Sequence, residues 1–263
     1  QPAGALSCLF SVRAELALGG WRMAMTVTAA ACLTLGLVWA LMRELCTAPQ
    51  TAQTQKNQAA KLNWQFFRRG RLFYFMGVAC LTGMIRDGLT SWAPVYFSEE
   101  FSLNATLSLI LSAVLPAAKI LALAVHPAVQ KKVPKTRTQL IVFYVGCAAA
   151  ACIVLLANLA GWTLAAAGFM AIMLCLMVCT DLSFTISIPI QFGSVGRSAT
   201  VSGILDCMLY LGAAISSYLF ALLAQWGGWT ATIVSWIVIP LIAIGILLSR
   251  KNLEPETAEK SHL

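Results

Sequence analysis

The chain has 263 residues, of which 59% are hydrophobic and 11% are charged, and its mean hydropathy is +0.80. Ordinary soluble domains carry roughly 25% charged residues, so this composition excludes that class and indicates a protein of the lipid bilayer. The net charge of +8 does not indicate a nucleic-acid partner, because the basic residues gather in alternate loops between apolar runs.

Seven apolar runs follow one another along the chain. A helix of about 20 residues, rising 1.5 Å per residue, crosses the hydrocarbon core, and each run is close to that length or longer. The sequence therefore predicts an all-α, polytopic membrane helical bundle with seven transmembrane helices. The runs are Met23–Met42, Leu72–Val95, Asn104–His126, Gln139–Asn158, Gly161–Ile186, Thr200–Leu223 and Trp229–Ser249.

The loops between the runs differ in charge from one side to the other. The loops on one side contain no Lys or Arg, and the first of them carries Glu99 and Glu100. By the positive-inside rule the basic side is cytoplasmic, so the C-terminus is expected inside. The basic residues on this side are Arg43, Lys56, Lys61, Arg68, Arg69, Arg71, Lys131, Lys132, Lys135, Arg137, Arg197, Arg250, Lys251 and Lys260.

Nine cysteines would suggest disulfides in a small secreted protein, but eight of these lie in or beside apolar runs. They are interpreted as small packing residues. Cys175 and Cys179 lie one helical turn apart without the companion ligands of a zinc site. We therefore expect no metal and no cofactor.

Five ionisable residues fall inside the apolar runs. Each costs about 2.5–3.5 kcal/mol at the centre of a membrane helix, so such residues usually mark function. They are Arg86, Asp87, Lys119, Asp181 and Asp206.

Arg86 lies more than two turns from either end of its run, too deep for its side chain to reach water easily. Thr90 follows it on the same helical face. Two interpretations stay open: a binding residue for an anion, or one member of a structural ion pair with Asp87 or with an aspartate of another helix.

The other charges allow similar alternatives. Lys119 either reaches the cytoplasm, pairs with Asp206 or Asp181, or lines a binding site. Asp181 is close enough to the end of its run that capping, or pairing with loop arginines, is the interpretation we favour. Asp206 and Tyr210 belong to a small and polar stripe, which indicates either close helix packing or a water-lined path. The stripe consists of Gly203, Asp206, Tyr210, Ala213 and Ser217.

Three motifs resemble one known family. They are "GWR" (Gly20–Arg22), "RDGLTSWAPVYFSEEF" (Arg86–Phe101) and "IPIQFGSVGRSATVSGILD" (Ile188–Asp206). They are similar to the start of the sixth helix, the seventh helix and the tenth-to-eleventh connection of the major facilitator superfamily. Within it, the organophosphate:phosphate antiporters, which include glycerol-3-phosphate and hexose-phosphate transporters, are the group that the chain resembles most.

Members of this superfamily have twelve helices in two six-helix halves. The resemblance implies that the chain corresponds to helices six to twelve and is an N-terminally truncated fragment whose partner is the missing N-terminal half. It implies an outer-side segment and last helix of the N-terminal half over 1–45 and a cytoplasmic linker over 46–71. The C-terminal six-helix half then covers 72–250, and a cytoplasmic tail covers 251–263.

In the phosphate antiporters, one arginine from each half holds the substrate phosphate, and Arg86 matches the second of them. Guanidinium suits this task because its planar fork donates two parallel hydrogen bonds to an oxyanion. One departure is the loop "HPAVQKKVPKTR", which keeps the family's basic residues but lacks its aspartate. The expected substrate-binding residues are Arg86, Asp87, Thr90, Lys119, Asp206 and Tyr210.

These features predict a secondary active transporter, not an enzyme, that moves a small anionic or phosphorylated solute by alternating access in a bacterial cytoplasmic membrane. The sequence contains no P-loop motif, which disfavours ATP-driven transport by this chain. The alternatives are a transporter-like seven-helix sensor or receptor, or a fragment without activity of its own. A retinal protein is disfavoured because Trp229–Ser249 contains no lysine for a Schiff base.

Overall fold

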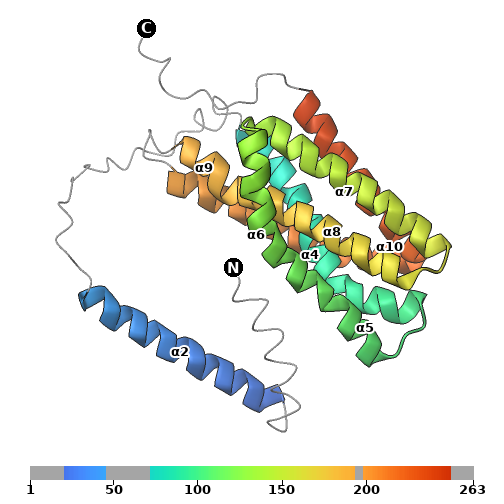
Figure 1. Cartoon of the computed structure of the whole chain (residues 1–263), viewed down its shortest axis with the longest axis horizontal. Helices are drawn as coiled ribbons and strands as arrows, with labels where there is room; N and C mark the ends of the chain where they lie inside the picture. Colours follow the sequence, from blue (N-terminus) through green and yellow to red (C-terminus); the bar gives the residue numbers. More distant parts are fainter. Residues whose placement is uncertain (1–20, 46–71, 193–197, 250–263) are drawn as a thin grey trace. The chain divides into compact units, whose positions relative to one another are not determined.

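A computed structural model describes residues 21–45, 72–192 and 198–249, and within these ranges it contains helices and turns but no strand (Figure 1). Six of its helices are long and apolar enough to cross a membrane. The predicted all-α membrane bundle is therefore confirmed. The predicted linker over 46–71 and the tail over 251–263 lie outside the described residues.

The chain divides into two units, residues 1–61 and 62–263. The first unit contributes α2 (Trp21–Leu45), which contains the whole run predicted at Met23–Met42. The hydroxyls of Thr26 and Thr34 donate to carbonyls three residues earlier in the same helix. These bonds satisfy two polar groups within an apolar helix without a partner from elsewhere.

In the second unit the predicted runs at Leu72–Val95 and Gln139–Asn158 each form one helix. These are α4 (Leu72–Glu100), which continues through Pro94, and α7 (Thr136–Leu159). Proline is tolerated inside membrane helices because neighbouring groups can satisfy the carbonyl that it leaves without a donor.

The third run, predicted as one helix, is two helices in the structure. α5 (Ala105–Ser112) begins with the Asn104 side chain accepting from the Leu107 N–H at 2.9 Å. α6 (Val114–Lys132) follows directly. The break lies at Ala113, three residues before Pro116, whose missing N–H and bulky ring weaken the turn preceding it.

The fifth run also changes its helical form. α8 (Thr163–Leu182) continues into η1 (Ser183–Ser187), a single turn of π-helix, and then into α9 (Ile188–Gln191). Such turns carry one extra residue and often occur at functional sites. The sequence analysis did not predict this change of helical form.

The last two runs lie in α10 (Ser198–Leu248), which is assigned as one helix of 51 residues. At 1.5 Å per residue this is about 77 Å, far more than one bilayer crossing requires. Gly228 interrupts it with φ 66° and ψ −172°, a conformation that glycine adopts without a steric penalty. Two helical parts, 198–227 and 229–248, therefore meet at Gly228, and the count of seven spans stays a prediction.

Helix α4 packs against both α8 and α10. Its crossing with α10 is close because glycines from both helices meet the facing backbone. A methyl group on Gly83 would collide with the carbonyl of Leu209, and one on Gly212 would collide with the carbonyl of Cys80. Small residues allow this approach of two membrane helices. The crossing fixes α4 and α10 next to each other one turn before Arg86.

Candidate functional site

Arg86 occupies the interior of the second unit. Its side chain projects from α4 one turn after the glycine crossing, and the residue is 8% exposed. It is the one buried Lys or Arg among the described residues. Because a buried charge without partners is very costly, the structure must supply counter-charges close by.

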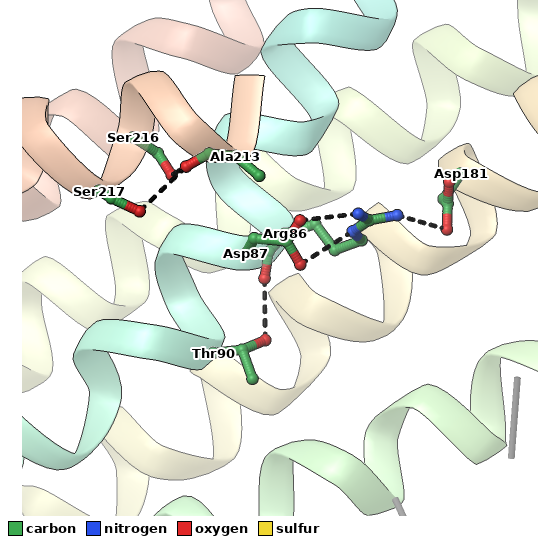
Figure 2. A network of polar contacts seen from close by, with 7 residues as sticks. All are labelled: Arg86, Asp87, Thr90, Asp181, Ala213, Ser216 and Ser217. Atoms are coloured by element: carbon green, nitrogen blue, oxygen red, sulfur yellow. Dashed lines mark hydrogen bonds and ion pairs between the residues drawn. The ribbon is translucent and has the colours of Figure 1, made fainter. Parts of the chain in front are cut away.

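Two carboxylates supply that charge (Figure 2). On one edge of the guanidinium, Nε donates to Oδ1 of Asp87 at 3.2 Å and Nη2 donates to Oδ2 of the same residue at 2.7 Å. At the other end, Nη1 lies 2.8 Å from Oδ2 of Asp181 on α8. Arg86 therefore links two helices and is bound at both ends.

The first part of α10 completes the surroundings of the guanidinium. Cζ of Arg86 lies 5.7 Å from the centroid of the Tyr210 ring, a cation–π distance. Tyr210 is 54% exposed. Asp206, one turn earlier, is half-buried and interacts electrostatically with Asp181. Residues of α4, α8 and α10 thus converge on one charged group.

The carboxylates outnumber the cation within this group. Arg86 carries one positive charge, whereas Asp87 and Asp181 carry two negative charges when both are ionised. Asp181 also has a buried oxygen, Oδ1, with no hydrogen-bond partner among the described residues. A carboxylate oxygen that is buried without a partner costs free energy. A proton or a hydrogen-bond donor at Oδ1 of Asp181 would therefore stabilise the site.

Of the residues predicted to bind substrate, Asp87 and Tyr210 lie against Arg86 in the structure. Thr90 Oγ1, in contrast, donates to the backbone carbonyl of Arg86 at 2.9 Å, so its hydroxyl hydrogen is engaged within α4. The hydroxyl of Ser217, a residue of the polar stripe, likewise donates to the backbone carbonyl of Ala213 within α10. Lys119 lies half-buried on α6, which packs against α8.

The interpretation of Asp181 was wrong. Capping or pairing with loop arginines was expected, but Asp181 pairs with Arg86. The expectation failed because it considered depth along one helix, whereas the packing of α8 on α4 decides which charge lies opposite. The sequence analysis had left this pairing open, because one interpretation of Arg86 was an ion pair with an aspartate of another helix.

These observations define a class: a polytopic helical membrane protein with a charged centre enclosed by three of its helices. The family model described as Major Facilitator Superfamily matches residues 10–205, more than half of the chain. The chain therefore belongs to the major facilitator superfamily, and its fold and family support a transporter of small molecules. Neither the curated proteins nor the solved structures contain a match.

Proposed function

We propose that this chain forms part of a secondary active transporter that moves a small anionic or phosphorylated solute by alternating access. Arg86 is the residue to which the solute binds, and Asp87, Tyr210 and Asp206 surround it. The organophosphate:phosphate antiporters are the group within the superfamily that this proposal favours. The observation that supports it most directly is a buried guanidinium at the convergence of α4, α8 and α10.

A guanidinium is well suited to such binding. It stays protonated, and its Nε and Nη2 atoms form a fork that matches two oxygens of a phosphate or carboxylate. In this structure that fork holds the carboxylate of Asp87. This contact supports an oxyanion-binding role for the fork, and in the proposal a solute oxyanion binds by taking the place of Asp87.

The surroundings of the fork leave access for a solute. The side chain of Asp87 is 30% exposed and that of Asp181 is 17% exposed, whereas that of Arg86 is 10% exposed. The exposed ring of Tyr210 lies beside the guanidinium on the same wall. Water and a small solute can therefore reach the Asp87 side of the group more readily than the Asp181 side.

The remaining parts of the transporter follow from the resemblance. In the proposal, the chain corresponds to helices six to twelve, and the N-terminal half provides the opposite wall and a second cationic group. The C-terminus lies in the cytoplasm of a bacterial cell, and Lys119 contributes to the wall from α6. Two halves that rock about this centre would expose it alternately to the two sides of the membrane.

The test is uptake by the protein as its gene encodes it, reconstituted in liposomes. The labelled probes are inorganic phosphate, glycerol 3-phosphate and glucose 6-phosphate. Arg86→Lys keeps the charge but loses the fork, so we expect uptake to fall to background while the amount inserted stays normal. Arg137→Lys is the matched control, because Arg137 lies on α7, where its Nε donates to the backbone carbonyl of Leu247.

Uptake that is unimpaired in Arg86→Lys would overturn the role of this residue. A protein that binds a probe through Arg86 but transports none of them would favour the sensor instead. In that case binding would change a signalling output, and no label would enter the liposomes.

A further inference from the structure

Three exposed lysines gather at the connection between α6 and α7. Lys131 and Lys132 are the last residues of α6, and Lys135 directly precedes the first residue of α7. Because Lys132 and Lys135 are three residues apart, their Cα atoms lie within about 11 Å of each other. The connection therefore holds three ammonium groups close together at one end of the helices.

These lysines have no carboxylate close to them in the sequence. The chain contains no Asp or Glu between Glu100 and Asp181, a stretch that includes all of α6 and α7. None of the three lysines forms an ion pair within the described residues. In addition, no side chain caps the start of α7, and the N-terminus of a helix carries roughly half a positive charge. The positive potential of this connection is therefore not balanced by its own helices.

Hydrogen bonds hold the start of α7 in place behind the lysines. Nε2 of Gln191, the last residue of α9, donates to Oγ1 of Thr136 at 3.0 Å. Nε of Arg137 donates to the backbone carbonyl of Leu247, near the end of α10, at 2.8 Å. Figure 1 shows α9 and the connection between α6 and α7 at the same end of the helices. Lys135 therefore begins from a fixed backbone position, which lowers the entropy cost of binding a ligand.

Both helices continue from the lysines as exposed apolar rows. On α7 the exposed positions recur every three or four residues, and toward the start of the helix the same row passes Thr138 and reaches Lys135. On α6 a similar row ends at Lys131. Both helices are long and apolar enough to belong to spans of the membrane. The α7 row consists of Val142, Val145, Ala149, Cys152 and Leu156, and the α6 row consists of Leu121, Ala124 and Ala128.

We infer that the connection and the two rows form a binding site for an anionic phospholipid of the leaflet on the basic side of the membrane. The headgroup phosphate binds to Lys131, Lys132 and Lys135, and the acyl chains lie along the α6 and α7 rows. An ammonium group suits a headgroup because it attracts phosphate as a point charge and needs no fixed fork geometry. Basic residues beside a membrane span attract anionic lipids in the same way.

The apolar rows favour a lipid over other anions. A soluble phosphate or an acidic protein segment would pair with the lysines but would leave both rows without a ligand. A phospholipid matches the charged end and the apolar faces together. This inference goes beyond the proposed function, because it requires only membrane helices with lysines at their ends and does not involve Arg86.

The experiment measures lipid binding to the protein as its gene encodes it, by native mass spectrometry from an uncharged detergent. Dioleoyl phosphatidylglycerol is the anionic probe, and dioleoyl phosphatidylcholine has the same chains but no net charge. Native protein should bind the first lipid at least about tenfold more tightly. This preference should weaken as the salt concentration rises from about 0.1 M to about 1 M, because the screening length falls from about 10 Å to about 3 Å.

Substitution of the lysines tests their part directly. The triple change Lys131→Gln, Lys132→Gln and Lys135→Gln should weaken binding of phosphatidylglycerol on the order of a hundredfold, since each lysine contributes about fivefold. Arginine at the same three positions keeps the charge and should retain the preference for the anionic lipid.

A variant of equal net charge is the matched control. Lys56→Gln, Lys61→Gln and Lys260→Gln remove three positive charges from the segments predicted as linker and tail, and should leave the affinity close to native. If this control loses the lipid as strongly as the triple change in the connection, binding follows net charge alone and the inference is overturned. It is also overturned if native protein shows no preference for phosphatidylglycerol, a comparison that decides the matter even if the triple variant does not insert.

Two further outcomes identify what binds. Glycerophosphoglycerol is the headgroup without its chains, so equal affinity for it would show a site for free phosphate and overturn the role of the apolar rows. Arg86→Lys should bind phosphatidylglycerol as native protein does. A loss of transport in that variant with unchanged lipid binding would keep this site separate from the proposed solute site.

Discussion

The middle and the C-terminal end of α4 use polar side chains in two different ways. In the middle, Arg86 is charged, buried and shared between two carboxylates. At the end, the hydroxyl of Tyr96 donates to Oδ1 of Asn158 at 2.7 Å, and the Asn158 amide donates to Glu100 at 2.9 Å. The second network ties α4 to α7, and its buried members are neutral.

Aromatic rings surround the end network. Tyr96 packs edge-on against Trp229 and Trp236, with ring centroids 5.4 Å and 6.4 Å apart, and Nε1 of Trp229 donates to Glu99 at 2.9 Å. These contacts also join α4 to the second part of α10. The indole Nε1 of Trp236 has no hydrogen-bond partner among the described residues. The edge-to-face rings and the hydrogen bonds donated by Tyr96, Asn158 and Trp229 favour one fixed arrangement.

The end of α4 is built as a structural anchor, whereas its middle carries a charged group shared between two carboxylates. At the end of α4 every hydrogen bond described joins a neutral donor to an oxygen, and large buried rings exclude water. In the middle, one cation holds two carboxylates, and the buried Oδ1 of Asp181 lacks a partner among the described residues. Both places therefore contain a buried atom without a partner among the described residues, Oδ1 of Asp181 and Nε1 of Trp236, but of the two only the middle has a buried cation between two carboxylates.

The largest effect is expected from removing the cation. Arg86→Met leaves Asp87 and Asp181 facing each other without a counter-charge, and breaking a buried pair in this way costs about 3–5 kcal/mol. Thermal unfolding in detergent should show a large loss of stability. Arg86→Met combined with Asp181→Asn should recover part of that loss, because one of the two uncompensated carboxylates is gone.

If the double variant is no more stable than Arg86→Met, the two residues are not energetically coupled. The middle of α4 would then resemble the end of the helix, and the comparison drawn above would fail.

The next largest effect concerns the crossing that positions the charged centre. Gly212→Ala places a methyl group against the carbonyl of Cys80, so α10 must shift away from α4 at a cost of about 1–3 kcal/mol. Gly77→Ala is the matched control, because a methyl group there meets no other atom and gains about 0.5–1 kcal/mol of helix stability. Unfolding temperatures that move alike in both variants would contradict the close crossing.

A smaller effect is expected at the end of α4. Tyr96→Phe keeps the packed ring but removes the donor to Asn158, a change worth about 0.5–1.5 kcal/mol. Stability should fall by this amount, and transport measured per folded molecule should stay close to native. A loss of transport that exceeds the loss of folded protein would show that the end network also takes part in function.

The smallest effect is expected at the exposed ring beside Arg86. Tyr210→Leu removes the cation–π contact, which contributes about 0.5–1 kcal/mol at an exposed position, whereas Tyr210→Phe retains it. Unfolding experiments on the two variants should therefore differ by that amount. Equal stabilities would show that the ring contributes nothing to holding the guanidinium.

The helices were predictable because apolar runs of sufficient length must satisfy their backbone groups internally. The runs that became α2, α4 and α7 were placed within a few residues. The π-helical turn at Ser183–Ser187 was missed, since it depends on local backbone geometry that apolar composition does not encode. The break at Ala113 was missed because a proline in an apolar run does not decide by itself whether the helix continues, as α4 does through Pro94, or ends, as α5 does before Pro116.

The sequence by itself determined that the chain lies in a membrane and that Arg86 is a costly residue in the middle of a span, because length, hydropathy and depth are properties of one segment. It also supplied the motifs that resemble the superfamily to which the chain belongs. Only the tertiary structure decided that Asp181 is the second partner of Arg86 and that carboxylates exceed the cation there. Those facts depend on how α4, α8 and α10 pack, and a charge on one helix acquires its partner only when another helix is placed against it.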